Sequence, residues 1–180
     1  MIINGYKFGI VPNNQILAQL DALAPWFHRC FTTSVNHNDN PWGFTPENWR
    51  VGPVDDRDSA SFFLWQLAQW GAYFHLVTKE EDYAALAITV RLNEVVLADP
   101  RYQLAQWGAA PDDLYFAVYC VCPLHRGEKL ASKLIDHTVV HGRTIDPAPK
   151  SFFVRTHAGH EDRVIHSFIE RKVHIVGRYD

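Results

Sequence analysis

The sequence predicts an α/β protein built on a mixed sheet, and three observations carry that prediction. The strongest strand signal, Leu114 to Cys122, runs through a short turn directly into a helical pattern. The second half of the chain then alternates strand, helix, strand, helix, strand, which implies parallel pairing. In the first half, a charged turn joins two strand patterns and predicts an antiparallel hairpin.

Length and composition narrow the class of protein. A chain of 180 residues suits a single domain, 1–180, with a sizeable core. A formal charge of -3 gives no reason to expect a nucleic-acid partner. An odd number of cysteines, 3, argues against a disulfide framework and fits a reducing compartment. No apolar run reaches membrane-spanning length and the start does not resemble a signal peptide, so we expect a cytoplasmic protein with no membrane partner.

The first elements are a strand and a helix. Tyr6 to Val11 is the predicted first strand, and Pro12-Asn13-Asn14 provides helix-start chemistry. Pro25 is predicted to kink or divide the helix that follows. Apolar residues recur in that helix at helical spacing: Ile16, Leu20, Leu23, Phe27 and Cys30.

A long polar stretch separates this helix from the next. Asn36 to Asp58 is rich in Asn, Asp, Pro and Gly but carries the aromatics Trp42, Phe44 and Trp49, which favours a functional loop over simple disorder. Ser59 to Trp70 is a predicted helix that ends at Gly71. It is apolar nearly all round, so most of it should be buried.

The hairpin and the later elements follow in order. Tyr73 to Thr78 and Leu86 to Leu92 are the hairpin strands, joined through the charged turn Lys79 to Asp82. After the strand Leu114 to Cys122, the predicted elements are a helix from Glu128 to His141 ended by Gly142, a strand from Phe152 to His157, a helix from Glu161 to Lys172 and a strand from Val173 to Val176.

The turn between the strand and the helix of the second half predicts an anion site. It contains Pro123 and Gly127 and lies where the helix begins. Backbone N–H groups and the positive end of the helix dipole converge at such a point, and they bind phosphates above all.

The same stretch resembles the acyl-CoA-binding turn of the GNAT superfamily of N-acyltransferases, in which a strand ends in Val-x-Pro and Arg-Gly-x-Gly-x-Gly/Ala leads into a helix. The residues in register with that pattern are Val121, Pro123, Arg126, Gly127 and Ala131. Lys129 replaces the second glycine, and the order of predicted elements resembles GNAT from end to end. Near the end of the chain, Phe168 stands where the family often has tyrosine, and Glu161 where many members have asparagine.

The resemblance implies a fold and a cofactor site. The fold would be a mixed central sheet, flanked by about four helices, in which two parallel strands splay apart and the pantetheine arm of acyl-CoA lies in the gap. The main chain of Cys120 and Val121, near the strand end at Cys122, would pair with the arm. Lys133 would add a cation close to the phosphates. Backbone amides of the turn would hold the pyrophosphate, and these belong to Arg126, Gly127, Glu128, Lys129, Leu130 and Ala131.

Acyl transfer to an amine needs a polarised thioester, a neutral amine and a proton donor for the leaving thiolate. Many GNAT enzymes use the tyrosine that Phe168 replaces here, and Tyr119 on the central strand is the nearest phenol that could substitute. His75, Glu94 and His157 are the candidates for the general base. Cys120 or Cys122 as an acyl-carrying nucleophile is an alternative that lacks a clear base partner.

No metal site is expected. His137 and His141 are four residues apart on a predicted helix and could reach one ion. The segment lacks the glutamate of the His-Glu-x-x-His motif, and the sequence shows no third ligand.

The function that the resemblance implies is an N-acyltransferase that moves an acyl group from acyl-CoA to an amine of a small molecule or peptide by direct attack. A catalytically silent GNAT domain that binds acyl-CoA or a protein partner is one alternative, and an acyl-carrier-protein-dependent synthase of the same fold is another. GNAT domains usually end with two strands, whereas Val173 to Asp180 has room for one. Either Met1 to Asn4 would fill the missing position or, as we expect, a second copy would lend a strand in a homodimer.

Overall fold

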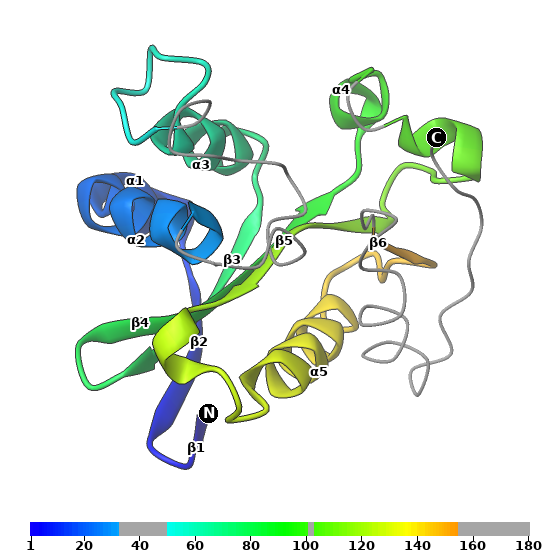
Figure 1. The fold of residues 1–180 in the computed structure, drawn as a ribbon. Helices are drawn as coiled ribbons and strands as arrows, with labels where there is room; N and C mark the ends of the chain where they lie inside the picture. The colour runs from blue at the N-terminus through cyan, green and yellow to red at the C-terminus, as the bar shows by residue number, and fades with distance from the viewer. Residues whose placement is uncertain (33–49, 101–102, 155–180) are drawn as a thin grey trace.

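A computed structural model of the chain describes residues 1–32, 50–100 and 103–154. Its centre is a six-stranded sheet with the order β1-β2-β3-β4-β5-β6 (Figure 1). Neighbouring strands are antiparallel except β5 and β6, which are parallel. The predicted mixed sheet is therefore confirmed. The strands are β1 (Ile2–Ile3), β2 (Tyr6–Val11), β3 (Tyr73–Lys79), β4 (Asp82–Arg91), β5 (Leu114–Val121) and β6 (Phe152–Val154).

The amino-terminal segment lies at the edge of the sheet opposite β6. Asn4 and Gly5 have φ of 52° and 79°, which is the backbone of a tight two-residue hairpin turn. The turn folds β1 back onto β2, and the amide of Phe8 donates to the Met1 carbonyl at 2.7 Å. Met1 to Asn4 therefore does not fill a position beside β6, and that alternative is wrong because the local turn pairs the segment with its own neighbour.

Three helices, α1 (Asn13–Ala18), α2 (Leu20–Thr32) and α3 (Ala60–Gln69), cover one face of the sheet (Figure 1). The predicted helix after the first strand is divided, but at Gln19 and not at Pro25. The amide of Gln19 bonds to the Ile16 carbonyl and ends α1, while its own carbonyl accepts from Leu23 and begins α2. Pro25 lies inside α2.

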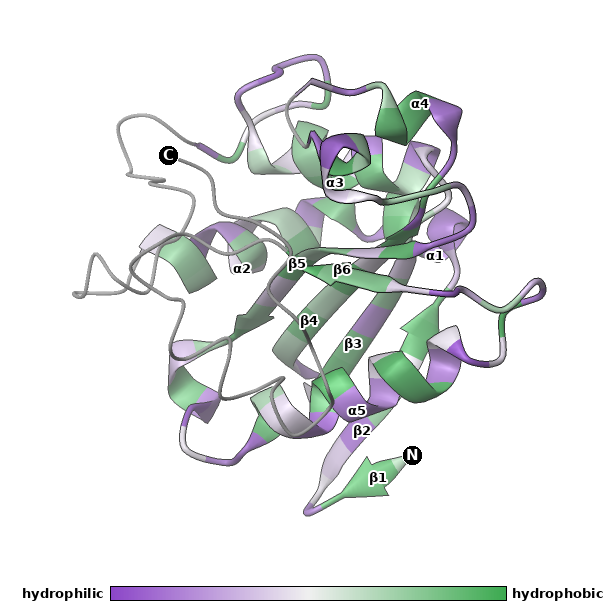
Figure 2. Cartoon of the chain, turned by 90° about the vertical axis from the view of Figure 1, so that its right-hand side faces the viewer, coloured by the Kyte–Doolittle hydropathy of each residue, from purple (hydrophilic) through white to green (hydrophobic). Residues whose placement is uncertain are grey.

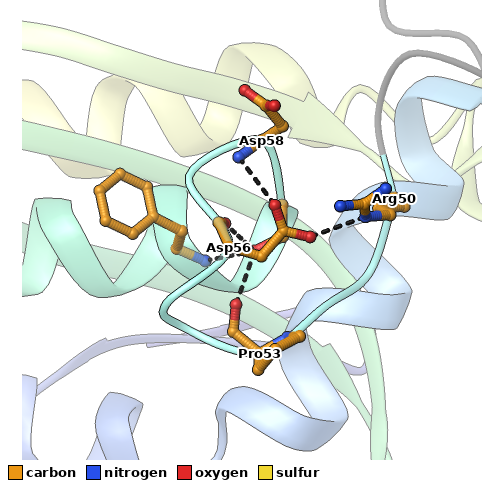
Figure 3. A network of polar contacts seen from close by, with 6 residues as sticks. Arg50, Pro53, Asp56 and Asp58 are labelled. Atoms are coloured by element: carbon orange, nitrogen blue, oxygen red, sulfur yellow. Dashed lines mark hydrogen bonds and ion pairs between the residues drawn. The ribbon is translucent and has the colours of Figure 1, made fainter.

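The segment before α3 is held by polar contacts (Figure 3). Arg50 Nε lies 2.7 Å from Asp56 Oδ2, and the Ser59 hydroxyl donates to the Asp56 carbonyl at 2.7 Å. Ser59 Oγ also accepts from the amide of Phe62 at 3.0 Å and so caps α3. Gly71, with φ of 74°, follows the helix end, as predicted. The part of the predicted loop from 36 to 49 lies outside the described residues.

On the other face lies α5 (Leu130–Gly142) (Figure 2). Its buried side chains Leu130, Leu134 and Ile135 pack onto the sheet. The helix begins at Leu130 rather than at Glu128, because Lys129 has the left-handed backbone conformation that a helix cannot contain.

The remaining elements connect the strands. The hairpin of β3 and β4 is confirmed, although β4 begins earlier than predicted, at Asp82, and has a bulge at Ala84. After β4 come α4 (Glu94–Leu97) and the 3₁₀ helix η2 (Leu104–Trp107). The predicted elements after Val154 lie outside the described residues. Within the described ranges, none of the helices has the length and apolar character needed to span a membrane.

Candidate active site

The turn that leaves β5 has an unusual backbone. The amide of Cys122 bonds to the Ala84 carbonyl at 2.9 Å, and the chain then passes through the 3₁₀ helix η3 (Pro123–His125). Gly127 has φ of 87° and Lys129 has φ of 56°. The left-handed conformation therefore occurs at the two positions where the resembled motif has glycine.

The left-handed backbone shows the effect of having Lys129 in place of the second glycine of the motif. Lys129 follows the backbone path that favours glycine, so the replacement adds a side chain without removing the turn. As the residue before α5, Lys129 makes no side-chain capping bond to the first turn of the helix. Lys133 Nζ lies 3.3 Å from the Glu128 carbonyl oxygen, which places a second cation beside the turn.

The turn is attached to the sheet through an aromatic contact that the sequence did not indicate. Tyr6 Oη and His125 Nδ1 are 3.2 Å apart, and the rings meet edge to face with centroids 5.7 Å apart. Lys79 Nζ lies 5.1 Å from the centroid of the Tyr6 ring. These residues are far apart in the sequence, so no local pattern signals the contact.

The described part of β6 pairs with the start of β5 in parallel. The register runs from Leu114 opposite Phe152 to Phe116 opposite Val154. The next residue of β5, Ala117, is a bulge, because Thr89 is opposite Phe116 while Ile88 is opposite Val118. A bulge bends its strand and re-aims the residues that follow.

The pairing beyond the bulge decides which main-chain groups face away from β4. Cys122 donates to Ala84 on β4, and alternate residues of an antiparallel strand point their N–H and C=O groups to opposite sides. Tyr119 and Val121 therefore face away from β4, whereas Cys120 and Cys122 face it. Of the main-chain pair expected for the pantetheine arm, Val121 faces away from β4 and Cys120 faces it, because adjacent residues of a strand face opposite sides.

The candidate base Glu94 and the candidate proton donor Tyr119 lie towards opposite ends of β5, whereas His75 is in register with Tyr119 across Ala87 of β4. The Tyr119 side chain is half-buried and packs on the α5 face of the sheet. Glu94 is exposed in the first turn of α4, after the end of β4 that lies beside the start of β5. His157 lies outside the described residues, as do Glu161 and Phe168.

His75 is unsuited to act as the general base. It is 0 % exposed beneath α5, and burial together with the neighbouring His141 and His137 lowers its pKa to about 3. A base that accepts a proton from an amine near neutral pH needs a pKa near neutrality.

Cys120 is also unsuited to act as a nucleophile. Cys120 is buried, and burial followed by the neighbouring Cys30 thiol raises its pKa well above the usual range. A thiol with a raised pKa stays protonated, and the thiolate is the reactive form. Cys30, Cys120 and Cys122 are all free thiols.

The structure brings a third histidine to the pair noted in the sequence. His75 on β3 faces His137 and His141 on α5. In the described ranges, no group of three histidine, cysteine or acidic side chains is arranged to hold a metal ion.

Several solved structures with the same architecture are acetyltransferases. An aminoglycoside acetyltransferase, meta-AAC0020 from an uncultured soil metagenomic sample, in complex with trehalose, superposes with a TM-score of 0.58 at 16% identity, over 100% of this chain and 98% of the other. A ribosomal-protein-alanine N-acetyltransferase from Brucella melitensis biovar Abortus 2308 gives a TM-score of 0.54 at 14% identity, over 97% and 95% of the two chains. The chain has the GNAT fold.

A further structure with this fold contains a cofactor-derived ligand. It is AAC(6')-Iy in complex with a bisubstrate analog, CoA-S-monomethyl-acetylneamine, with a TM-score of 0.55 at 11% identity over 97% of this chain and 93% of the other. No protein-family profile matches the sequence, and no curated protein matches it. At these identities the likeness establishes the GNAT fold, and the activity has to be argued from the residues of this chain.

Proposed function

We propose that this GNAT-fold chain, as one catalytic domain from 1 to 180, is an N-acyltransferase that uses acyl-CoA. The observation that carries the proposal is the path from β5 into α5. The strand has a bulge at Ala117 and leads to a turn with left-handed backbone at Gly127 and Lys129. Such a turn at a helix N-terminus suits a pyrophosphate.

The proposed coenzyme site uses the main chain and nearby cations. Amides from Arg126 to Ala131 and the dipole of α5 would bind the pyrophosphate. Lys129 and Lys133 would supply charge-assisted contacts to phosphate oxygens. The pantetheine arm would lie along the edge of β5 at Tyr119 and Val121, the residues whose main chain faces away from β4.

The proposed reaction is direct attack by an amine on the thioester. A C–N bond forms, the C–S bond breaks, and the coenzyme leaves as a thiolate. Tyr119 is the candidate that gives the thiolate a proton, and the attacking amine loses a proton to water. Acceptors would be amines of small molecules or peptides, in keeping with a GNAT-fold aminoglycoside acetyltransferase solved with sisomicin, over 98% of this chain at 14% identity.

One observation favours a second candidate, a binding domain without catalysis. Lys129 places a side chain at the second glycine position, where close approach of the backbone to phosphate is most sensitive to added atoms. In that case the chain would bind coenzyme A or a protein partner and turn over no substrate. An acyl-carrier-protein donor is the third alternative.

Two measurements on the full chain separate these functions. Calorimetric titration with coenzyme A is expected to show saturable binding. Thiol release from acetyl-CoA and longer acyl-CoAs, with aminoglycosides, small amines and peptides as acceptors, is expected to depend on one acceptor class. Binding without any turnover would support the binding domain over the enzyme. Absence of coenzyme A binding would overturn both the acyl-CoA-dependent enzyme and the coenzyme-binding domain. Turnover with acyl-carrier protein alone would identify the third alternative.

A further inference from the structure

Three histidine rings meet between β3 and α5. His75 Nδ1 and His137 Nδ1 are 3.4 Å apart, and the ring centroids of His75 and His141 are 5.1 Å apart. Tyr73 also meets His141, with ring centroids 4.9 Å apart. We call His75, His137 and His141 the histidine cluster. It lies between the helix and the sheet that the helix covers.

The hydrogen bonds of the cluster suit neutral rings. A neutral imidazole has one N–H donor and one acceptor nitrogen. His75 Nε2 lies 3.4 Å from Thr89 Oγ1. A neutral His75 can therefore donate to one of its two neighbours, His137 or Thr89, and accept from the other, which satisfies both nitrogens of its ring. With His75 and His137 both protonated, N–H would face N–H across 3.4 Å. His141 Nδ1 is buried and has no hydrogen-bond partner.

In the described part of the chain, the titratable groups in ring contact with the cluster, or acting on its charge, are its own rings, one phenol and one amino group. On α5 they are His137 and His141, and on β3 they are His75 and Tyr73. From the β1 edge, the amino group of Met1 acts on His137 and is itself positive. The neighbours from β2 and β4, Phe8 and Thr89, carry no charge.

We propose that the histidine cluster is a proton-sensitive latch that holds α5 on the sheet at neutral pH and releases it in acid. The α5 helix begins directly after the turn at Gly127 and Lys129. Release of the helix would therefore remove the geometry proposed for the pyrophosphate site. This consequence for the coenzyme rests on the proposed function, whereas the latch itself does not.

The direction of the effect follows from the depressed pKa values of the cluster. Burial lowers the pKa of His137 and His141, as it does that of His75. The closed form, in which α5 lies on the sheet, therefore binds fewer protons than the open form, in which α5 is released. The free energy of opening is greatest above about pH 6.5, the ordinary pKa of histidine, and decreases as the pH falls below that value. Uptake of one to two protons would raise the opening constant about tenfold to a hundredfold for each pH unit.

Native-state hydrogen exchange of the full chain at pH 7 and pH 5, expressed as protection factors, tests the latch. The amides of Leu134, Ile135 and Thr138 on α5 are expected to lose at least tenfold protection at pH 5. Those of Leu76 and Leu86 in the β3–β4 hairpin are expected to lose much less. Equal loss in both regions would mean global acid unfolding and would overturn a local latch, as would unchanged protection of α5.

Variants test whether the histidines cause the effect. The double variant His137→Gln, His141→Gln keeps helix-forming polar residues at half-buried positions. Between pH 7 and pH 5, its α5 amides should lose at least tenfold less protection than those of the parent protein. The matched control is His28→Gln on α2, which should behave as the parent protein does. An unchanged dependence in the double variant would overturn the proposal. The single variants answer the same question if the double variant is unstable.

Coenzyme titrations separate this proposal from the proposed function. If coenzyme A binds at pH 7, its affinity is expected to fall with the protection of α5 between pH 7 and pH 5. The double variant should retain more of that affinity at pH 5. If coenzyme A does not bind at pH 7, the proposed function fails, and hydrogen exchange still decides the latch.

Discussion

Gly142, the last residue of α5, lies directly against the ring of Phe152 at the start of β6. A Cβ at position 142 would come 2.6 Å from Phe152 Cε1 and 2.8 Å from Leu114 Cδ1. These contacts join the end of the helix to the two parallel strands. Glycine at this helix end is therefore a packing requirement as well as a stop signal.

The first prediction concerns this packing. Gly142→Ala should lower the free energy of unfolding by about 1–3 kcal/mol, because overpacking outweighs the gain in helix propensity. Denaturant unfolding measures the change. Gly9→Ala in β2 is the matched control, since a Cβ there would meet nothing within 4 Å, and it should be neutral or stabilising. Equal effects at both positions would contradict the packing argument.

The second prediction concerns the backbone at Lys129. Because its φ is 56°, Lys129→Gly should be more stable than Lys129→Ala by about 1 kcal/mol. The order should reverse at Lys133 inside α5, where glycine should be less stable than alanine by about 1 kcal/mol. Chemical denaturation of the four variants tests both statements. Alanine more stable than glycine at both positions would show that Lys129 has no left-handed conformation in solution.

The third prediction concerns the turn as an anion site. Gly127→Asp should place a carboxylate beside the proposed pyrophosphate and lower coenzyme A affinity at least tenfold, or about 1.4 kcal/mol. Gly108→Asp is the control, because Gly108 has φ of 84° and open space around it, so the backbone strain is matched away from the turn. Calorimetry on both folded variants measures the affinities, and equal affinities would remove the site from this turn.

The fourth prediction concerns the proton donor. Tyr119→Phe should lower turnover about a hundredfold and leave coenzyme A affinity unchanged, because the hydroxyl acts on the leaving thiolate. Steady-state kinetics and calorimetry on the same preparation separate the two effects. Turnover equal to that of the parent protein would exclude Tyr119 from the reaction.

The fifth prediction concerns the assembly. With β1 paired to β2, the amino-terminal segment cannot supply a strand beside β6, so the expectation of a strand-lending homodimer stays. Size exclusion with light scattering at micromolar concentration should give twice the chain mass of 20.7 kDa. A monomeric mass at every concentration would rule out the dimer.

The sequence by itself determined the elements whose signals are local. The strand Tyr6–Val11, the start of α3 at Ser59 and its end before Gly71, and the charged turn of the β3–β4 hairpin agree with the structure, because helix-end signals, turn chemistry and burial periodicity act within a few residues. The turn proposed to bind phosphate was also visible, since its glycine and its place before a helix are sequence features.

Only the tertiary structure decided how distant segments meet. It showed the bulge at Ala117, the contact of Tyr6 with His125, and the position of His75 opposite His137. Periodicity reports which side of a segment is buried but not which segment covers it, so His75 remained a candidate base until its burial under α5 was known. The left-handed backbone of Lys129 was also not predictable from the sequence, because lysine does not prefer that conformation.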